Sequence, residues 1–146
     1  MKEIHTKTEI EINAPVERVW GILTDFARFP EWNPFIRQAR GELKTGARLE
    51  MRAQLLGSKG TTFQPTVMAV EPNRELRWLG RFLLPGMIAG EHRFLLQSLG
   101  PERTRFIHEE TFRGLLVPLL ANWLGRKTRQ GFEGMNRALK TRAEEW

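Results

Sequence analysis

The chain has 146 residues, a length typical of one domain, and it lacks cysteine, which excludes disulfides, thiolate nucleophiles and cysteine-based metal sites. Its net charge of +6 comes largely from arginines placed singly at alternate positions, which indicates a solvated sheet face and no nucleic-acid site. The charged N-terminus lacks a signal sequence, and the apolar run 115–124 is too short to span a membrane. We therefore expect one domain over 1–146, cytoplasmic and without stable membrane insertion.

The N-terminal third predicts one strand followed by two short helices. Residues 4–12 alternate between charged residues and Ile or Thr, which predicts a strand with one apolar face. A helix over 15–23 is predicted from apolar residues at helical spacing: Val16, Val19, Trp20 and Leu23. A second short helix carries Phe26 and Phe29 and is expected to end at Pro30.

The middle of the chain has a period of two and predicts six strands. They are expected at residues 35–40, 47–55, 63–70, 76–82, 90–96 and 106–112, with a turn at 57–60 between the second and third. Strands joined by tight turns at this spacing form an antiparallel meander. The last thirty residues return to helical periodicity and predict a long amphipathic helix with one apolar face: Leu120, Trp123, Leu124, Phe132, Met135 and Leu139.

These elements define the predicted fold class as α+β. A curved antiparallel seven-stranded sheet wraps on the long C-terminal helix, with two short helices after strand one, because only that helix is large enough to cover the apolar face of the sheet. Side chains cannot always fill the space inside so curved a sheet. We therefore expect an internal cavity.

Hairpin register brings three functional side chains together on the inner face. If the turn at 99–102 is tight, His92 lies opposite Glu110, and if the turn at 83–87 is tight, Trp78 lies opposite His92. A carboxylate beside an imidazole favours the charged ring and fixes its tautomer, as a general base requires. The structural alternative is that two buried polar groups satisfy each other.

Other site signatures are weak or missing. His108 shares the parity of Glu110, which is compatible with an inward position, whereas His5 has the parity of the charged face. The three histidines lack short ligand spacing, so we expect no metal and no cofactor. Neither the glycine-rich nucleotide-binding loops nor the G-x-S-x-G motif of serine hydrolases occurs.

Several segments resemble the START/Bet v 1-like superfamily (SRPBCC), in its polyketide cyclase/dehydrase and lipid-transport-like branch. They are residues 12–20, 23–26, 29–35, 76–78, 90–94 and 104–114. The resemblance implies a helix-grip fold with a deep hydrophobic cavity, in a superfamily that includes lipid and hormone carriers and aromatase/cyclase-type enzymes. It supplies no universal catalytic motif, so function has to be argued from the pocket.

Three functions follow as hypotheses, each compatible with a monomer or a homodimer. The first is binding of a hydrophobic or aromatic small molecule as a carrier, sensor or store, with the cavity lined by Trp78, His92, Phe94, Glu110, Phe112, Trp32 and Phe35. The second is a cyclase/dehydratase-type enzyme in which His92 is the general base or acid and Glu110 holds it. The third is a partner-binding or membrane-surface protein, suggested by residues 115–124 and 126–129.

Overall fold

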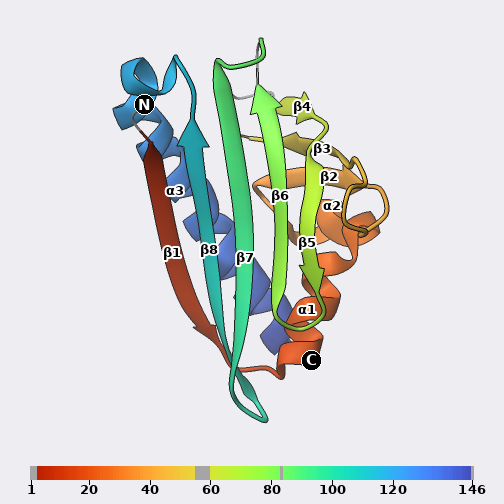
Figure 1. Cartoon of the computed structure of the whole chain (residues 1–146). Helices are drawn as coiled ribbons and strands as arrows, with labels where there is room; N and C mark the ends of the chain where they lie inside the picture. Colours follow the sequence, from red (N-terminus) through yellow and green to blue (C-terminus); the bar gives the residue numbers. More distant parts are fainter. Residues whose placement is uncertain (1–2, 55–59, 83, 146) are drawn as a thin grey trace.

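A long antiparallel sheet of five strands carries most of the fold (Figure 1). The computed structural model describes residues 3–54, 60–82 and 84–145. In spatial order the strands are β1 (Ile4–Ile12), β8 (Arg103–Arg113), β7 (Ile88–Gly100), β6 (Glu75–Phe82) and β5 (Thr66–Glu71). The last four form the predicted meander, and β1 pairs with β8 at its edge.

The single seven-stranded sheet of the prediction is wrong. Within the described residues there are eight strands, and three of them form a second sheet in the order β2 (Ile36–Arg40), β3 (Glu50–Ala53), β4 (Thr61–Phe63). The strand predicted at 63–70 is broken at Pro65, because proline has no N–H to donate to a ladder. The turn predicted at 57–60 falls mainly on 55–59, which lie outside the described residues.

The two short helices follow β1 as predicted. The first is α1 (Val16–Thr24), which buries Val19 and Leu23, and a single 3-10 turn, η1 (Phe26–Arg28), leads into α2 (Phe29–Trp32). Pro30 does not end the second helix but lies in the first turn of α2. Its missing N–H costs nothing there, since the first turn has no intrahelical acceptor.

The C-terminal helix α3 (Val117–Glu144) runs the length of the large sheet and covers one face (Figure 1). Its buried side chains include the predicted Leu124, Phe132 and Leu139, but also two polar residues, Thr128 and Asn136. No described helix is long and apolar enough to cross a membrane. The space between α3 and the two sheets is where the core and the candidate site lie.

Candidate functional site

The predicted register of the inner face is confirmed. His92 pairs with Glu110 across the β7–β8 ladder and with Trp78 across the β6–β7 ladder. His92 and Glu110 are only 4% and 5% exposed, and His108, two residues before Glu110 on β8, is fully buried. Two imidazoles and a carboxyl are therefore held on one buried face, where unpaired charge is costly.

Two glycines make room beside the carboxyl. Gly80 and Gly90 lie opposite each other on β6 and β7, so this part of the inner face has no side chains. A Cβ added at Gly90 would lie 2.4 Å from Oε2 of Glu110. A cavity of about 10 Å³ remains above the glycines, close to the space that one water molecule occupies.

Four of the seven predicted lining residues form the wall of this cavity, and three do not. Its walls are formed by Phe35, Ile36, Ala53, Phe63, Trp78, Gly80, Phe82, Gly90, His92 and Glu110. Phe94 and Phe112 are buried on the same face beside it, where Phe94 contacts the rings of Trp78 and His92. Trp32 lies elsewhere: it packs on Phe29 and lines a hollow on the outer surface. Helical periodicity placed Trp32 in an aromatic turn without indicating which side of that turn faces inward.

Sequence reasoning missed four wall residues. Ile36 and Ala53 belong to the second sheet, and Phe63 and Phe82 make a ring contact with centroids 5.0 Å apart. Phe82 shares the strand parity of Trp78, and Ala53 lies on the apolar face of its predicted strand, so both signals were present in the sequence. Their convergence depends on how the second sheet folds over the first.

A chain of buried polar side chains leads away from the cavity. Nδ1 of His92 lies 3.6 Å from Oε1 of Glu110, beyond hydrogen-bond length, and its Nε2 lies 2.7 Å from Nε2 of His108. Nδ1 of His108 lies 2.8 Å from Oδ1 of Asn136 on α3. Asn136 in turn donates to the hydroxyl of Thr8 on β1 at 2.9 Å. Thr8 and Asn136 also line a surface groove between β1 and α3, so the chain joins the cavity to the surface.

The direction of each hydrogen bond follows from Thr8. Its hydroxyl has one hydrogen, which it donates to the backbone carbonyl of His108 at 3.1 Å, so its oxygen accepts from the Asn136 amide. Oδ1 of Asn136 must then accept from Nδ1–H of His108, which leaves Nε2 of that neutral ring as an acceptor. His92 therefore donates through Nε2, and its Nδ1 presents a lone pair to Glu110.

Burial keeps all three ionisable groups neutral near pH 7. It raises the pKa of Glu110 to about 8 and lowers the pKa of His108 to about 3, the latter opposed in part by the bond to Asn136. Burial, and next the neighbouring His108, hold the pKa of His92 well below its usual range. Desolvation of His92 thus outweighs the preference for a charged ring that a neighbouring carboxylate would give, because the carboxyl of Glu110 is itself protonated.

Aromatic rings hold the two imidazoles in place. The ring of Phe132 on α3 stacks on His108 with centroids 3.7 Å apart and an interplanar angle of 12°. The ring of His92 contacts those of Trp78 and Phe132, each with its centroid 5.0 Å away. The described residues contain no group of three or more His, Asp or Glu placed to hold a metal ion.

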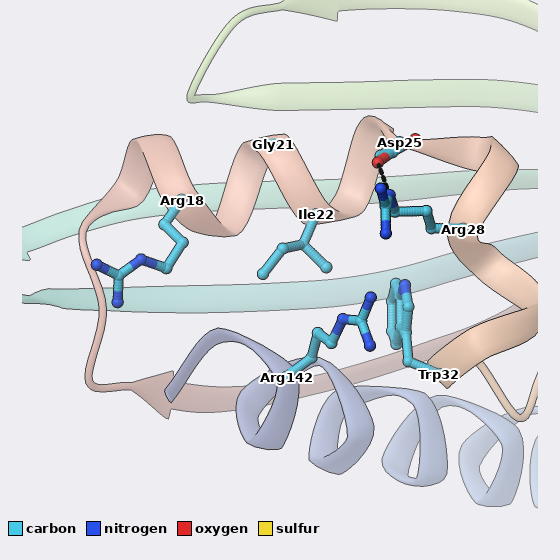
Figure 2. A pocket seen from close by; sticks show the side chains of 7 residues that line it. All are labelled: Arg18, Gly21, Ile22, Asp25, Arg28, Trp32 and Arg142. Atoms are coloured by element: carbon cyan, nitrogen blue, oxygen red, sulfur yellow. Dashed lines mark ion pairs between the residues drawn. The ribbon is translucent and has the colours of Figure 1, made fainter. Parts of the chain in front are cut away.

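A larger hollow of about 430 Å³ lies on the surface between α1 and α3 (Figure 2). Ile22 from α1 and Arg142 from α3 point into it. Two of its arginines form ion pairs: Arg28 lies 3.3 Å from Asp25, and Arg142 lies 2.6 Å from Glu31. The hollow therefore holds solvated ion pairs, whereas the internal cavity holds the buried groups with shifted pKa values.

Comparisons with known proteins agree with the fold described above. The sequence model of a family described as polyketide cyclase / dehydrase and lipid transport matches residues 3–144. No curated protein matches the chain.

Solved structures resemble the whole chain. A START superfamily protein from Mycobacterium smegmatis is 21% identical with a TM-score of 0.79, and covers 97% of both chains. The Zhui aromatase/cyclase from Streptomyces sp. R1128 is 14% identical with a TM-score of 0.78, over 98% of this chain and 94% of that one. Ara h 8.0201 is 12% identical with a TM-score of 0.73, over 97% and 98%. At these identities the likeness shows the helix-grip fold alone.

Proposed function

Because the chain belongs to the polyketide cyclase/dehydrase and lipid-transport family, we propose that it is a cytoplasmic binding protein for a hydrophobic or aromatic small molecule with an oxygen acceptor. The observation that carries this proposal is the buried carboxyl of Glu110 beside the side-chain-free patch at Gly80 and Gly90, where burial raises its pKa to about 8. The carboxyl would hold the ligand oxygen, and the surrounding rings would hold its apolar body.

The chemistry of the wall defines the ligand class. A protonated carboxyl donates one hydrogen bond, so Glu110 suits a carbonyl or ether oxygen and disfavours a carboxylate or phosphate in this desolvated place. The lone pair on Nδ1 of His92 can accept from a ligand hydroxyl. A phenol or hydroxyketone would therefore satisfy both groups at once.

Binding requires the walls to move apart. Typical ligand pockets have volumes of about 300–1,000 Å³, far above the 10 Å³ present. The contact between Phe63 on β4 and Phe82 on β6 joins the two sheets over the glycine patch. We expect this contact to open when a ligand enters, since Phe63 is the aromatic wall residue of the smaller sheet.

The test uses a matched pair of probes, acetylnaphthalene and ethylnaphthalene, which differ in the carbonyl oxygen. We expect the ketone to bind at least about tenfold more tightly than the hydrocarbon, as measured by quenching of tryptophan fluorescence. Glu110→Gln keeps a donor and should preserve this preference, whereas Glu110→Leu should abolish it. Equal binding of both probes to the unaltered protein would overturn the proposal.

Cyclase/dehydratase-type catalysis is a second candidate, favoured by the neutral acid and neutral base that face each other. A β-hydroxy ketone loses water when a base removes the proton between its two functional groups and an acid protonates the departing hydroxyl. Nδ1 of His92 would take the first proton and Glu110 would supply the second. The resulting imidazolium and carboxylate, 3.6 Å apart, would return to neutrality by one proton transfer.

His92→Gln separates the two candidates. If the protein only binds, this variant should keep most of its affinity for acetylnaphthalene. If it is a dehydratase, the protein should convert a β-hydroxy aryl ketone into the conjugated enone, followed by absorbance, and His92→Gln should lose at least about a hundredfold in rate. Absence of enone formation by the unaltered protein would remove the enzymatic candidate for this substrate class.

A further inference from the structure

Two uncharged segments that are distant in the sequence meet at one end of the molecule. Residues 82–90, between Arg81 and Glu91, carry no charge, and neither do residues 114–125, between Arg113 and Arg126. Backbone hydrogen bonds join them: Leu115 N–H donates to the Gly86 carbonyl at 3.0 Å, and Leu116 N–H donates to that of Met87 at 3.1 Å. This is the end where the β6–β7 connection and the start of α3 lie (Figure 1).

Three leucines of these segments project into solvent. Leu84, Leu115 and Leu119 are 72%, 62% and 81% exposed, and we call them the leucine tip. The remaining strongly exposed large apolar residue of the described chain is Met68 on β5. Scattered exposure is normal for single apolar residues, but three of four gathered on two joined segments indicate an interaction surface.

The surroundings of the leucine tip are mainly basic. Exposed cations border or follow both segments: Arg81, Arg113, Arg126, Lys127 and Arg129. The bordering acid, Glu91, lies 3.7 Å from Arg77, and Glu3 lies 2.7 Å from Arg113. Projecting apolar side chains with cations around them complement a surface whose anionic groups lie outside and whose interior is apolar. We call these cations the basic band.

We infer that the leucine tip docks this protein on an anionic lipid bilayer, with the leucines between the headgroups and the basic band against them. Three side chains are too few for a stable protein interface, which needs about 800 Å² from each partner. Peripheral membrane binding, in contrast, is commonly built from a modest apolar insertion together with a basic patch. Charge complementarity therefore favours the bilayer over a second copy of the chain.

Docking there would bring the bilayer close to the cavity. Phe82 and Gly90, the two ends of the first uncharged segment, are also cavity wall residues. If the proposed function holds, on which this step alone rests, an apolar ligand dissolved in the bilayer has a short route to Glu110. The docking surface itself does not depend on what the cavity binds.

Co-sedimentation of the full chain with lipid vesicles tests the inference. One vesicle type is phosphatidylcholine alone, and the other contains about one quarter phosphatidylglycerol. We expect at least about tenfold tighter binding to the anionic vesicles at low salt, weakened at high salt. The double variant Leu84→Asp, Leu119→Asp should lose at least about tenfold in affinity, whereas the matched control Met68→Asp should bind as the unaltered protein does.

Three outcomes would overturn the inference. They are absence of binding to anionic vesicles, equal binding by the double leucine variant, and a concentration-dependent dimer that the leucine variant dissociates without any vesicle binding. Glu110→Leu keeps this test separate from the proposed function. That variant should lose the preference for acetylnaphthalene and keep vesicle binding, whereas the leucine variant should do the reverse.

Discussion

The hairpin of β7 and β8 places two acid–base pairs one residue apart on opposite faces of the same sheet. On the outer face the guanidinium of Arg93 lies 3.3 Å from the carboxylate of Glu109, and on the inner face Nδ1 of His92 lies 3.6 Å from Glu110. Both pairs have the same ladder register. The outer pair is an ion pair, and the inner pair is neutral. The comparison teaches that register brings an acid and a base together, whereas access to water decides whether they ionise.

The two faces also differ in how their groups are connected. On the outer face Arg93 binds Glu75 at 2.9 Å as well as Glu109, and His5 lies 3.1 Å from Glu109, so each charge has several solvated alternatives. On the inner face the buried polar groups form one linear series in which each hydrogen bond has a single direction of donation. Removing one of these side chains should therefore lower the free energy of unfolding little on the outer face and much more on the inner face.

The largest expected effect on stability comes from interrupting the buried hydrogen-bond series at Asn136. Asn136→Leu leaves Nδ1–H of His108 without its acceptor in a desolvated place, so we expect the free energy of unfolding to fall by about 3 kcal/mol. Urea unfolding followed by circular dichroism measures this. Arg137→Leu, at the exposed neighbouring position of α3, is the control and should change stability by less than about 0.5 kcal/mol. Equal losses of unfolding free energy in both variants would contradict the proposed series of buried hydrogen bonds.

The next effect is a difference in pH dependence. The unfolded chain releases the Glu110 proton near pH 4.5, whereas the folded protein holds it to about pH 8. The stability from the protonated group is therefore complete below pH 4.5 and is lost as the pH rises to 8. Between pH 6.5 and 8 the unaltered protein should lose about 1.6 kcal/mol relative to Glu110→Gln, which has no proton to release.

The titration of His92 and His108 does not affect this difference in pH dependence, because the unaltered protein and Glu110→Gln both contain them. Their pKa values are lowered, so their contribution is present above pH 6.5 and is lost as the pH falls. Parallel stability curves for the two proteins from pH 6.5 to 8 would show that Glu110 is ionised in the folded state.

A smaller effect tests the space beside Glu110. Gly90→Ala would place a Cβ 2.4 Å from Oε2 of Glu110 and 3.0 Å from the ring of Phe112, which should cost about 1 kcal/mol. Gly80, directly opposite, has its nearest neighbour at 3.4 Å, so Gly80→Ala should be nearly neutral. Thermal unfolding of the two variants side by side checks the difference, and a reversed order would contradict the packing.

The smallest effect belongs to the outer face. Glu109→Gln removes a partner of Arg93 and His5, both of which remain in contact with water, so we expect a loss below about 1 kcal/mol that shrinks further in high salt. Unfolding at two salt concentrations measures it. A loss as large as that of Asn136→Leu would remove the distinction between the two faces.

The sequence predicted the facing of His92, Glu110 and Trp78 because alternation and tight turns determine register over short distances. It did not predict the division into two sheets, because the alternating pattern continues across Pro65, where the strand is interrupted. Asn136 was missed because helical periodicity was judged by apolar residues, although Asn136 lies on the buried face of α3. The neutral state of the inner pair depends on burial from all sides, which no local pattern records.

The charge of Glu110 is the central claim, and carbon NMR of the labelled side-chain carboxyl measures it directly. The resonance is assigned by its absence in Glu110→Gln and followed as a function of pH. We predict a midpoint near pH 8, with the protonated form dominant at neutral pH. A midpoint near pH 4.5 would mean that the inner pair ionises as the outer one does, and would contradict both the neutral carboxyl of Glu110 and the ligand class proposed from it.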